Sequence, residues 1–453
     1  SSSAASDVYK RQSFYNLARG AAQCKATFDA DANKISADFK ATDISAKSDD
    51  KTLDSISAKL DAAPGNQPEI RASVSIKSSR GNSDADFSAT LAEELSAKIS
   101  AKTLVLPDLL ALKNAFATRS ENSDAAKNTP ANPRNIRANF ALGGLVKKDA
   151  KAFWDIGKKF SAKATVEKLS AGETTVENLG ISFAGDAKEL AISDIAAHAC
   201  SGKLSGAVKI KFDAAKDKPY EIEKSKISLL GFDISKLSEN SAATGVFDAQ
   251  AEIFGSVETA AALADYAEFT AQITGKNGGV KLANANKSVG QKITLAQTAA
   301  KLANEFLKND SLASGIELSE RLSDFAFETA LLKISRTAPN FDIVIDSCEL
   351  ENSWAILKTE SGIIRFAPDT PFKEREIDVR FALYTADSRF AKLLQNVNAL
   401  AVSSDMDGFK KSETFKIFGT VANPQTNVID IVSGAKVQQI TPQSILNKIK
   451  LFK

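Results

Sequence analysis

The sequence predicts a mainly β protein: a long, curled antiparallel sheet, open as a groove or trough, with a few short amphipathic helices. Apolar or small residues recur at every second position in many segments, which is the period of a strand with one buried face. Turn-forming Gly, Pro, Asn and Asp residues separate these segments, as in an antiparallel meander. About half of the alternating apolar positions are Ala, which has weak strand propensity and buries little surface. Either a general Ala enrichment of the chain or an apolar face kept free for a ligand would explain this composition.

The first half of the chain shows the alternation most clearly. Ser36, Asp38 and Lys40 separate the apolar residues of the first such segment, which predicts a sheet with one wetted face. Turns are predicted at residues 64–66 and 80–82 and at Gly172, Gly180 and Gly185. The strands predicted in this half cover residues 35–41, 56–62, 70–76, 85–91, 95–101, 136–142, 160–166 and 204–212.

The second half returns to strands after a mixed region. Strands are predicted at residues 247–253, 325–334, 341–345, 353–358, 363–366, 377–383 and 415–421. Apolar residues at helical spacing predict helices at residues 107–116, 149–159, 257–267, 293–306, 388–400 and 443–452. Residues 119–134 are polar and contain Pro130 and Pro133, which is typical of a linker.

Composition excludes several classes of function. The 453 residues carry a net charge of +2, which argues against a nucleic-acid partner. A single His excludes any site that needs two, and Cys24, Cys200 and Cys348 form no CxxC pair. At most one disulfide could join these three cysteines, so they leave the redox compartment open. No run of about 18 apolar residues predicts a transmembrane helix.

No motif for catalysis or cofactor binding is found. His198 and Cys200 form a His-x-Cys pair without an orienting residue or an oxyanion loop nearby, so we interpret both as structural side chains. Gly143-Gly144 and Gly278-Gly279 are interpreted as turn glycines, because no phosphate-binding motif surrounds them. The sequence therefore predicts a protein that is not an enzyme, with no catalytic residues, no metal and no cofactor.

The second half resembles a known family in the order of its motifs. Residues 231–282 contain Asp-Ile-Ser-Lys-Leu, an Ala-Thr-Gly strand start, Phe-Gly-Ser, a predicted helix and a glycine turn at residues 274–279. Residues 417–424 end in Gly-Thr-Val-Ala-Asn-Pro, and residues 201–206 form a Ser-Gly-Lys-Leu-Ser-Gly hairpin. Over residues 225–435, this order resembles the C-terminal region of the AsmA-like proteins of the bacterial envelope, which include TamB-type relatives.

The resemblance implies a location and a role. Such proteins are held in the inner membrane by an N-terminal helix, extend through the periplasm toward the outer membrane, and take part in phospholipid transport and outer-membrane assembly. It implies phospholipid acyl chains and outer-membrane proteins as partners, and no catalytic residues. A structural or adhesive β-repeat protein of the envelope, without a lipid ligand, is the alternative.

The domain organisation follows from these patterns. We expect a non-native leader at residues 1–12, a β-repeat groove region at 13–218, an AsmA-like region at 219–436 and a helical tail at 437–453. The leader resembles a translated sequencing adapter, although a native Ser-rich tail is the alternative; with a leader of this kind, the membrane anchor would be missing. The residues predicted to line the lipid groove are Ile35, Phe39, Ile56, Leu60, Val74, Ile76, Phe87 and Leu91.

Overall fold

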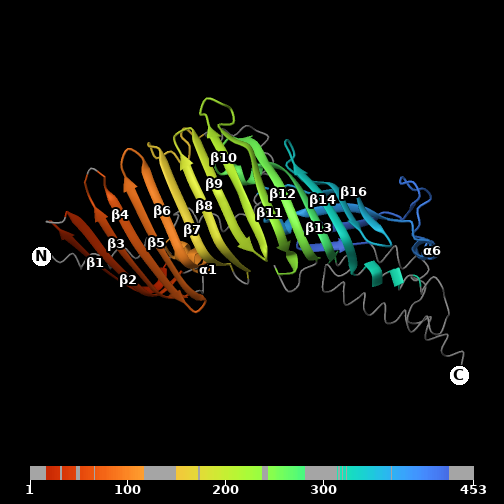
Figure 1. Cartoon of the computed structure of the whole chain (residues 1–453), viewed down its shortest axis with the longest axis horizontal. Coiled ribbons are helices and arrows are strands. Elements are labelled where there is room, and N and C mark those ends of the chain that lie inside the picture. The colour runs from red at the N-terminus through yellow and green to blue at the C-terminus, as the bar shows by residue number, and fades with distance from the viewer. Residues whose placement is uncertain are drawn as a thin grey trace, which may run out of the picture. The chain divides into compact units, whose positions relative to one another are not determined.

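The computed structural model confirms the predicted fold class. Among the residues that the structure describes, twenty strands are assigned to one mixed sheet, accompanied by a few short helices (Figure 1). The structure describes residues 17–30, 33–46, 52–65, 67–116, 149–171, 174–236, 243–280, 314, 317–318, 320–322, 324–368 and 370–427. The predicted leader, the linker at 119–134, the strand at 136–142 and the helices at 293–306 and 443–452 lie outside the described residues.

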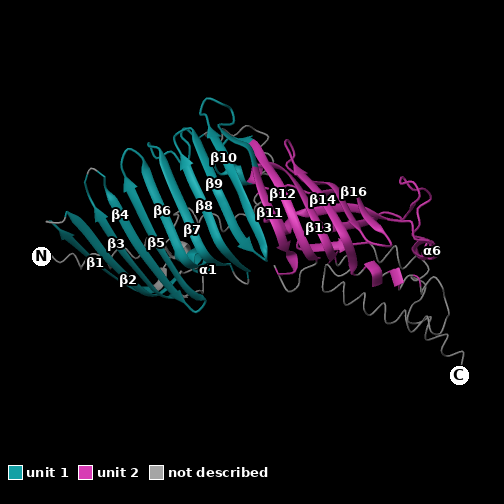
Figure 2. Cartoon of the chain, viewed as in Figure 1, with its two compact units in different colours: residues 1–225, 256–264 teal, residues 226–255, 265–453 magenta. Residues whose placement is uncertain are grey.

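The chain divides into two compact units (Figure 2). Unit 1 comprises residues 1–225 and 256–264, and unit 2 comprises residues 226–255 and 265–453. The first division falls within a strand, seven residues beyond the boundary expected at 218. Each unit is described separately below.

Unit 1 is built from long strands that follow one another along the sheet. Its elements are β1 (Leu17–Asp29), β2 (Lys34–Ala46), β3 (Thr52–Ala63), β4 (Glu69–Ser78), β5 (Gly81–Leu91), β6 (Leu95–Val105), α1 (Leu106–Phe116), β7 (Phe160–Ala171), β8 (Thr174–Gly185), β9 (Glu189–Ala199), β10 (Gly202–Phe212) and the first part of β11 (Tyr220–Asp233). Tight turns join several neighbours; Cys200 and Ser201 both have positive φ, as in the two-residue hairpins that match strand twist.

One strand pair in unit 1 departs from the predicted antiparallel pattern. β6 and β7 pair in parallel, with Leu95 opposite Phe160 and Ile99 opposite Ala164. Parallel neighbours need a long crossover connection, and here the connection begins with α1. Pro107 lies in the first turn of α1, where its missing N–H is tolerated. The prediction of an entirely antiparallel sheet was wrong at this pair, because alternation does not reveal strand direction.

Unit 2 contains the remaining strands and a larger core. Its elements are the rest of β11, most of β12 (Ala243–Val257), β13 (Glu268–Val280), β14 (Phe325–Arg336), β15 (Ile343–Glu351), β16 (Ile356–Ile364), β17 (Glu376–Thr385), β18 (Lys410–Lys411), β19 (Phe415–Thr420), β20 (Asn423–Thr426), α6 (Ser388–Asn396) and the short helices η5 (Ile234–Lys236) and η6 (Phe372–Glu374). From β12 to β17, each described neighbour pair is antiparallel.

The core of unit 2 lies between one sheet face and helical residues. Phe390, Leu393 and Leu394 of α6 are buried against strand residues that include Leu383 and Phe415. Asp387 caps this helix, accepting a hydrogen bond from the Phe390 backbone N–H at 2.9 Å. The predicted helix at 388–400 is therefore confirmed, although it ends at Asn396.

Two predicted helices were wrong in whole or in part. Residues 149–159 form turns instead of a helix: Gly157 has φ of 77°, and its N–H is bonded to the Asp155 side chain at 2.8 Å. The predicted helix at 257–267 reduces to α3 (Ala262–Tyr266): Val257 ends β12, and residues 258–261 form bends and turns in which the Ala260 N–H donates to Asp149 Oδ2. Each of these segments has helical apolar spacing, but local side-chain bonds and strand pairing prevail.

Several glycines predicted to form turns lie inside strands. Gly180 is in β8, and Gly278-Gly279 is in β13. A Cβ at Gly278 would lie 2.4 Å from the Phe327 ring, so close packing across the sheet requires glycine there. The predicted strands at 353–358 and 363–366 are one strand, β16, and the strand predicted at 341–345 begins at Ile343.

Among the strands that were not predicted are β1, β8 and β9 of unit 1 and the short β18 and β20 of unit 2. In β8 and β9, Asn178 and Asp194 have positive φ and coincide with shifts in the strand register. Such bulges interrupt the period of two on which the sequence prediction depended.

Candidate functional site on the apolar face of unit 1

The strand register brings all eight predicted groove residues onto one face of unit 1. Phe39 lies opposite Ala58, and Ala58 lies opposite Val74. Directly paired residues of neighbouring strands share a face, and so do residues two apart within a strand. Strand pairing and the two-residue repeat place the other six predicted residues on the same face as Phe39 and Val74: Ile35, Ile56, Leu60, Ile76, Phe87 and Leu91.

Helix α1 covers part of this apolar face. Ile56 and Ile76 are 4% and 2% exposed and belong to a core cluster that includes Ala111 of α1. Phe39 and Val74 are partly buried against the same cluster. Four of the eight predicted residues therefore pack within or against the protein's own core.

A buried ion pair holds the first turn of α1 to the strands. Asp108 is fully buried; its Oδ1 accepts a hydrogen bond from Arg80 Nε at 2.6 Å, and Arg80 Nη2 lies 2.5 Å from the same oxygen in an ion pair. Its Oδ2 accepts a hydrogen bond from the Ser78 hydroxyl at 2.7 Å. Ser78 and Arg80 flank the β4–β5 turn, so this carboxylate joins the helix to that turn. The sequence analysis had no signal for this contact, because its partners are about thirty residues apart.

The other predicted residues remain accessible to solvent. Ile35, Leu60 and Leu91 are 42%, 40% and 41% exposed, and Phe87 is half-buried. Two further residues belong with them and were not predicted as lining: Phe28, 65% exposed and opposite Ile35, and Ile99, opposite Phe87. The alternation of residues 95–101 could have identified Ile99. We call this set the exposed apolar strip: Phe28, Ile35, Leu60, Phe87, Leu91 and Ile99.

Small residues separate the large ones within the strip. Leu60 lies opposite Ala72, Ala72 opposite Phe87, and Phe87 opposite Ile99, so one row crosses β3 to β6. Among the described elements, those that pack closely on these strands are their neighbours in the sheet and α1. The strip can therefore offer an apolar surface to a ligand without moving a second sheet.

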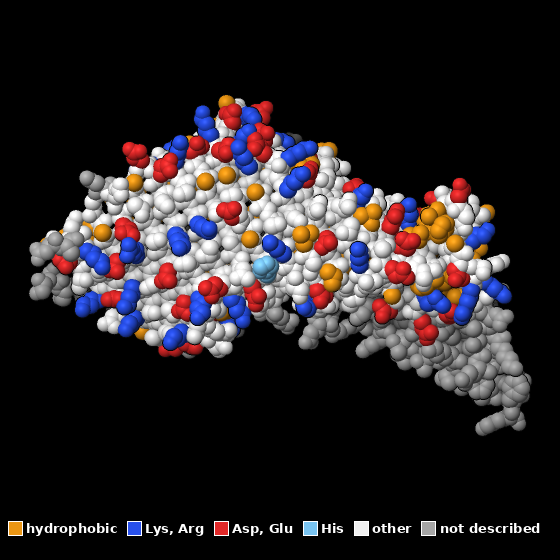
Figure 3. Space-filling view, viewed as in Figure 1, with side chains coloured by type: hydrophobic (Ala, Val, Ile, Leu, Met, Phe, Trp, Pro, Cys, Tyr) orange, Lys and Arg blue, Asp and Glu red, His pale blue; other side chains and the backbone are white. Residues whose placement is uncertain are grey.

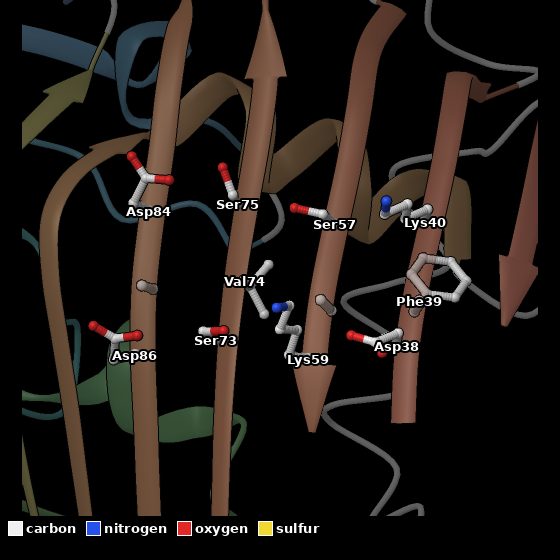
Figure 4. A pocket seen from close by; sticks show the side chains of 12 residues that line it. Asp38, Phe39, Lys40, Ser57, Lys59, Ser73, Val74, Ser75, Asp84 and Asp86 are labelled. Carbon is white, nitrogen blue, oxygen red and sulfur yellow. The ribbon is translucent and has the colours of Figure 1, made fainter. Parts of the chain in front are cut away.

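The opposite face of unit 1 is polar (Figure 3). Its charged and hydroxyl side chains form rows across the strands, and the row Asp38, Lys59, Ser73, Asp86 is typical (Figure 4). A shallow hollow of about 280 Å³ lies among these short side chains. Such an open, charged hollow shows no convergent arrangement of catalytic groups.

Hydrogen bonds shift the pKa values of charged side chains on this polar face. The pKa of Asp61 is lowered by a hydrogen bond from Ser36, at 2.6 Å, and by one from Lys34. The pKa of Lys209 is raised by its hydrogen bond to Glu189 and by the negative charge of Glu223. These groups stay charged near neutral pH and keep the face in water.

The His-x-Cys pair forms no catalytic arrangement in the described structure. His198 lies in β9, whereas Cys200 lies in the following turn with φ of 48°. The His198 ring nitrogen Nδ1 is 3.3 Å from the amide nitrogen of Asn178. Cys24, Cys200 and Cys348 are all free thiols, and burial raises the pKa of the Cys348 thiol.

Neither a metal-binding cluster nor a membrane-spanning helix occurs in the described part of the chain. Within it, no group of three or more His, Cys, Asp or Glu residues is placed to hold a metal ion. No helix in the same part is both long and apolar enough to span a membrane.

Comparisons with known protein families, with curated proteins and with solved structures find no match to this chain. The resemblance to AsmA-like proteins therefore stays a prediction from the short motifs quoted above.

Proposed function

We propose that this protein binds phospholipid acyl chains on the apolar face of unit 1 and takes part, without catalysis, in lipid transport and outer-membrane assembly in the bacterial envelope. The observation that carries the proposal is the exposed apolar strip, in which large apolar side chains are accessible on one face of a sheet whose other face is polar. Contiguous exposed apolar surface of this kind is typical of ligand or membrane contact.

The binding would depend on the hydrophobic effect alone. Each CH₂ of an acyl chain removed from water contributes about 0.8 kcal/mol. The row from Leu60 to Ile99 crosses four strands with Ala72 between the larger residues, so neighbouring positions offer similar contacts. Similar binding energies at successive positions would let a chain slide instead of being held at one point.

The location is taken from the resemblance to AsmA-like proteins. A periplasmic protein, anchored in the inner membrane in its full-length form, would need a surface that shields acyl chains while its other face contacts water. The polar rows of unit 1 supply the second property.

A second candidate function is a structural or adhesive envelope protein without a lipid ligand. One observation favours it: α1 buries Ile56 and Ile76, so part of the face is closed by the protein itself. If other parts of the protein also cover the exposed apolar strip, its side chains would stabilise the fold and would not be accessible to a lipid.

Substitution within the strip tests the proposal. Leu60→Asp and Leu91→Asp place a charge on residues that are 40% and 41% exposed, so folding should be retained. We expect phospholipid co-purifying with the full chain, measured by quantitative mass spectrometry, to fall several-fold in either variant, because burying an unpaired carboxylate against an acyl chain is costly.

Ser73→Asp is the matched control, because Ser73 is exposed on the polar face of β4. It should leave the lipid content unchanged. Equal lipid content in wild type and both strip variants would refute acyl-chain binding on this face, as would an equal loss in the control.

A further inference from the structure

An arginine at the end of β14 is buried among aromatic rings of unit 2. Arg336 is 7% exposed, and its guanidinium carbon lies 5.0 Å from the centre of the Phe366 ring and 5.9 Å from that of Phe341. Tyr266 packs edge-on against both rings. The rings hold the guanidinium by cation–π contact and exclude water from it.

The hydrogen-bonding capacity of Arg336 is not fully used. Its Nε donates to the Phe341 carbonyl oxygen at 3.1 Å, but its buried Nη2 has no hydrogen-bond partner among the described residues. Burying a charged donor without a partner is costly, so native proteins pair such groups with an anion or another hydrogen-bond acceptor. An anionic oxygen of a ligand could accept this hydrogen bond.

A second arginine lies on the same ring. The guanidinium carbon of Arg375 is 5.5 Å from the centre of the Phe366 ring, and its Nε donates to the Thr370 carbonyl oxygen at 3.3 Å. Arg375 is half-buried, so this second cation is open to solvent on one side.

The two cations are not neutralised by ion pairs within the described residues. The ion pairs described there join neither Arg336 nor Arg375 to a carboxylate. Burial lowers the pKa of Arg336, the positive charge of Arg375 lowers it further, and Asp265 and Tyr266 offset this only in part. Two guanidinium groups beside one ring can donate hydrogen bonds to one oxyanion.

We propose that Arg336 and Arg375 bind a phosphate group beside the Phe366 ring. Planar guanidinium groups donate paired hydrogen bonds to phosphate oxygens, and two of them can share one phosphate. The partnerless Nη2 of Arg336 would donate to one oxygen, and Arg375 would reach the same group from the solvent side. The site lies in unit 2 and does not depend on acyl-chain binding in unit 1.

The phosphate could belong to a phospholipid headgroup or be free inorganic phosphate. Calorimetric titration of the full chain with each ligand, at constant ionic strength set by chloride, separates the two sources. One arm uses inorganic phosphate and the other uses dihexanoyl-phosphatidic acid, a soluble short-chain phospholipid. Tighter binding of the lipid, with competition by phosphate, identifies a headgroup; equal or tighter binding of phosphate identifies the free anion.

Three variants test the assignment. Arg375→Gln and Arg336→Met should each weaken binding at least tenfold, because each removes one of the two guanidinium groups. Arg365→Gln is the control: Arg365 is exposed, adjacent to Phe366 in sequence and 3.9 Å from the Glu376 carboxylate, and its loss should leave affinity unchanged.

Arg375 is half-buried, so Arg375→Gln should fold normally. If Arg336→Met misfolds, the affinity of Arg375→Gln alone decides the outcome. The proposal is overturned if the wild type binds neither ligand, or if Arg375→Gln binds as tightly as the wild type.

Discussion

Tyr220 shows how one polar atom organises a local cluster in unit 1. Its ring is fully buried against Trp154 and Phe212, with ring centres 5.8 and 4.9 Å away. Its hydroxyl donates to Asp149 Oδ2 at 2.9 Å, and the same oxygen accepts the Ala260 backbone N–H at 3.0 Å. The carboxylate therefore ties together three segments that are distant in sequence.

The ionisation of Tyr220 gives a prediction at this scale. Burial and the Asp149 carboxylate raise its pKa from 10.0 to about 12. The neutral phenol is thus favoured in the folded state, so its contribution is complete below pH 10 and lost as the pH rises toward 12. Tyr220→Phe should lower the free energy of unfolding by about 1.5 kcal/mol at neutral pH.

Urea unfolding of both proteins across this pH range checks the prediction. The difference between wild type and Tyr220→Phe should shrink as the pH rises above 10, because the wild type alone loses the phenol's hydrogen bond. A difference that stays constant up to pH 12 would contradict the assignment of the raised pKa.

Helix α1 decides how much of the apolar face is exposed. Ala111 is 3% exposed between the helix and the sheet, where a larger side chain would separate the two. The Asp108 carboxylate fixes the start of the helix above the β4–β5 turn. The buried Asp108 carboxylate thus helps to hold α1 against the sheet.

Asp108→Asn should loosen this helix. The neutral amide cannot replace the charge-assisted bonds to Arg80, although it can still accept the Ser78 hydroxyl. We expect a loss of about 2 kcal/mol in the free energy of unfolding, since Arg80 can partly return to water. Hydrogen exchange should be faster in α1 and around Ile56 and Ile76.

Asp84→Asn is the control for this variant, because Asp84 is exposed on the polar face of β5. Its stability should match the wild type. Unchanged exchange rates in α1 of Asp108→Asn would rule out the carboxylate as the anchor of the helix.

At the scale of the whole molecule, each compact unit has its own buried cluster and its own tryptophan. Trp154 lies in unit 1, where its Nε1 donates to the Asp186 carbonyl oxygen at 2.8 Å. Trp354 lies in unit 2, with its ring centre 4.5 Å from that of Phe390. Proteins made of strands that contact mainly their neighbours need not unfold in a single step.

Phe390→Ala should destabilise unit 2 selectively. Phe390 is 2% exposed, and removing its ring should cost about 3–5 kcal/mol within that unit. In single-tryptophan versions of the chain, the urea midpoint reported by Trp354 should fall, and that reported by Trp154 should not change.

Gln395→Ala, an exposed position of the same helix, should leave both midpoints unchanged. An equal fall of the Trp154 and Trp354 midpoints in Phe390→Ala would mean that the two units unfold as one.

The order of amino acids alone was enough to predict which residues share a face of the sheet. Alternation of apolar and polar residues is local, and antiparallel pairing preserves it from strand to strand, so residues as distant as Ile35 and Leu91 were predicted correctly to share one face. Apolar residues at helical spacing likewise located α6 and α1.

Only the tertiary structure decided which residues of that face are covered. Ile56 and Leu60 have the same pattern and lie in one strand, yet α1 buries the first and leaves the second 40% exposed. Tertiary structure also decided the parallel direction of the β6–β7 pair. It likewise decided the surroundings of Arg336, whose aromatic neighbours Phe341 and Phe366 come from separate loops. Burial depends on packing between segments far apart in the chain, and a local period carries no information about those partners.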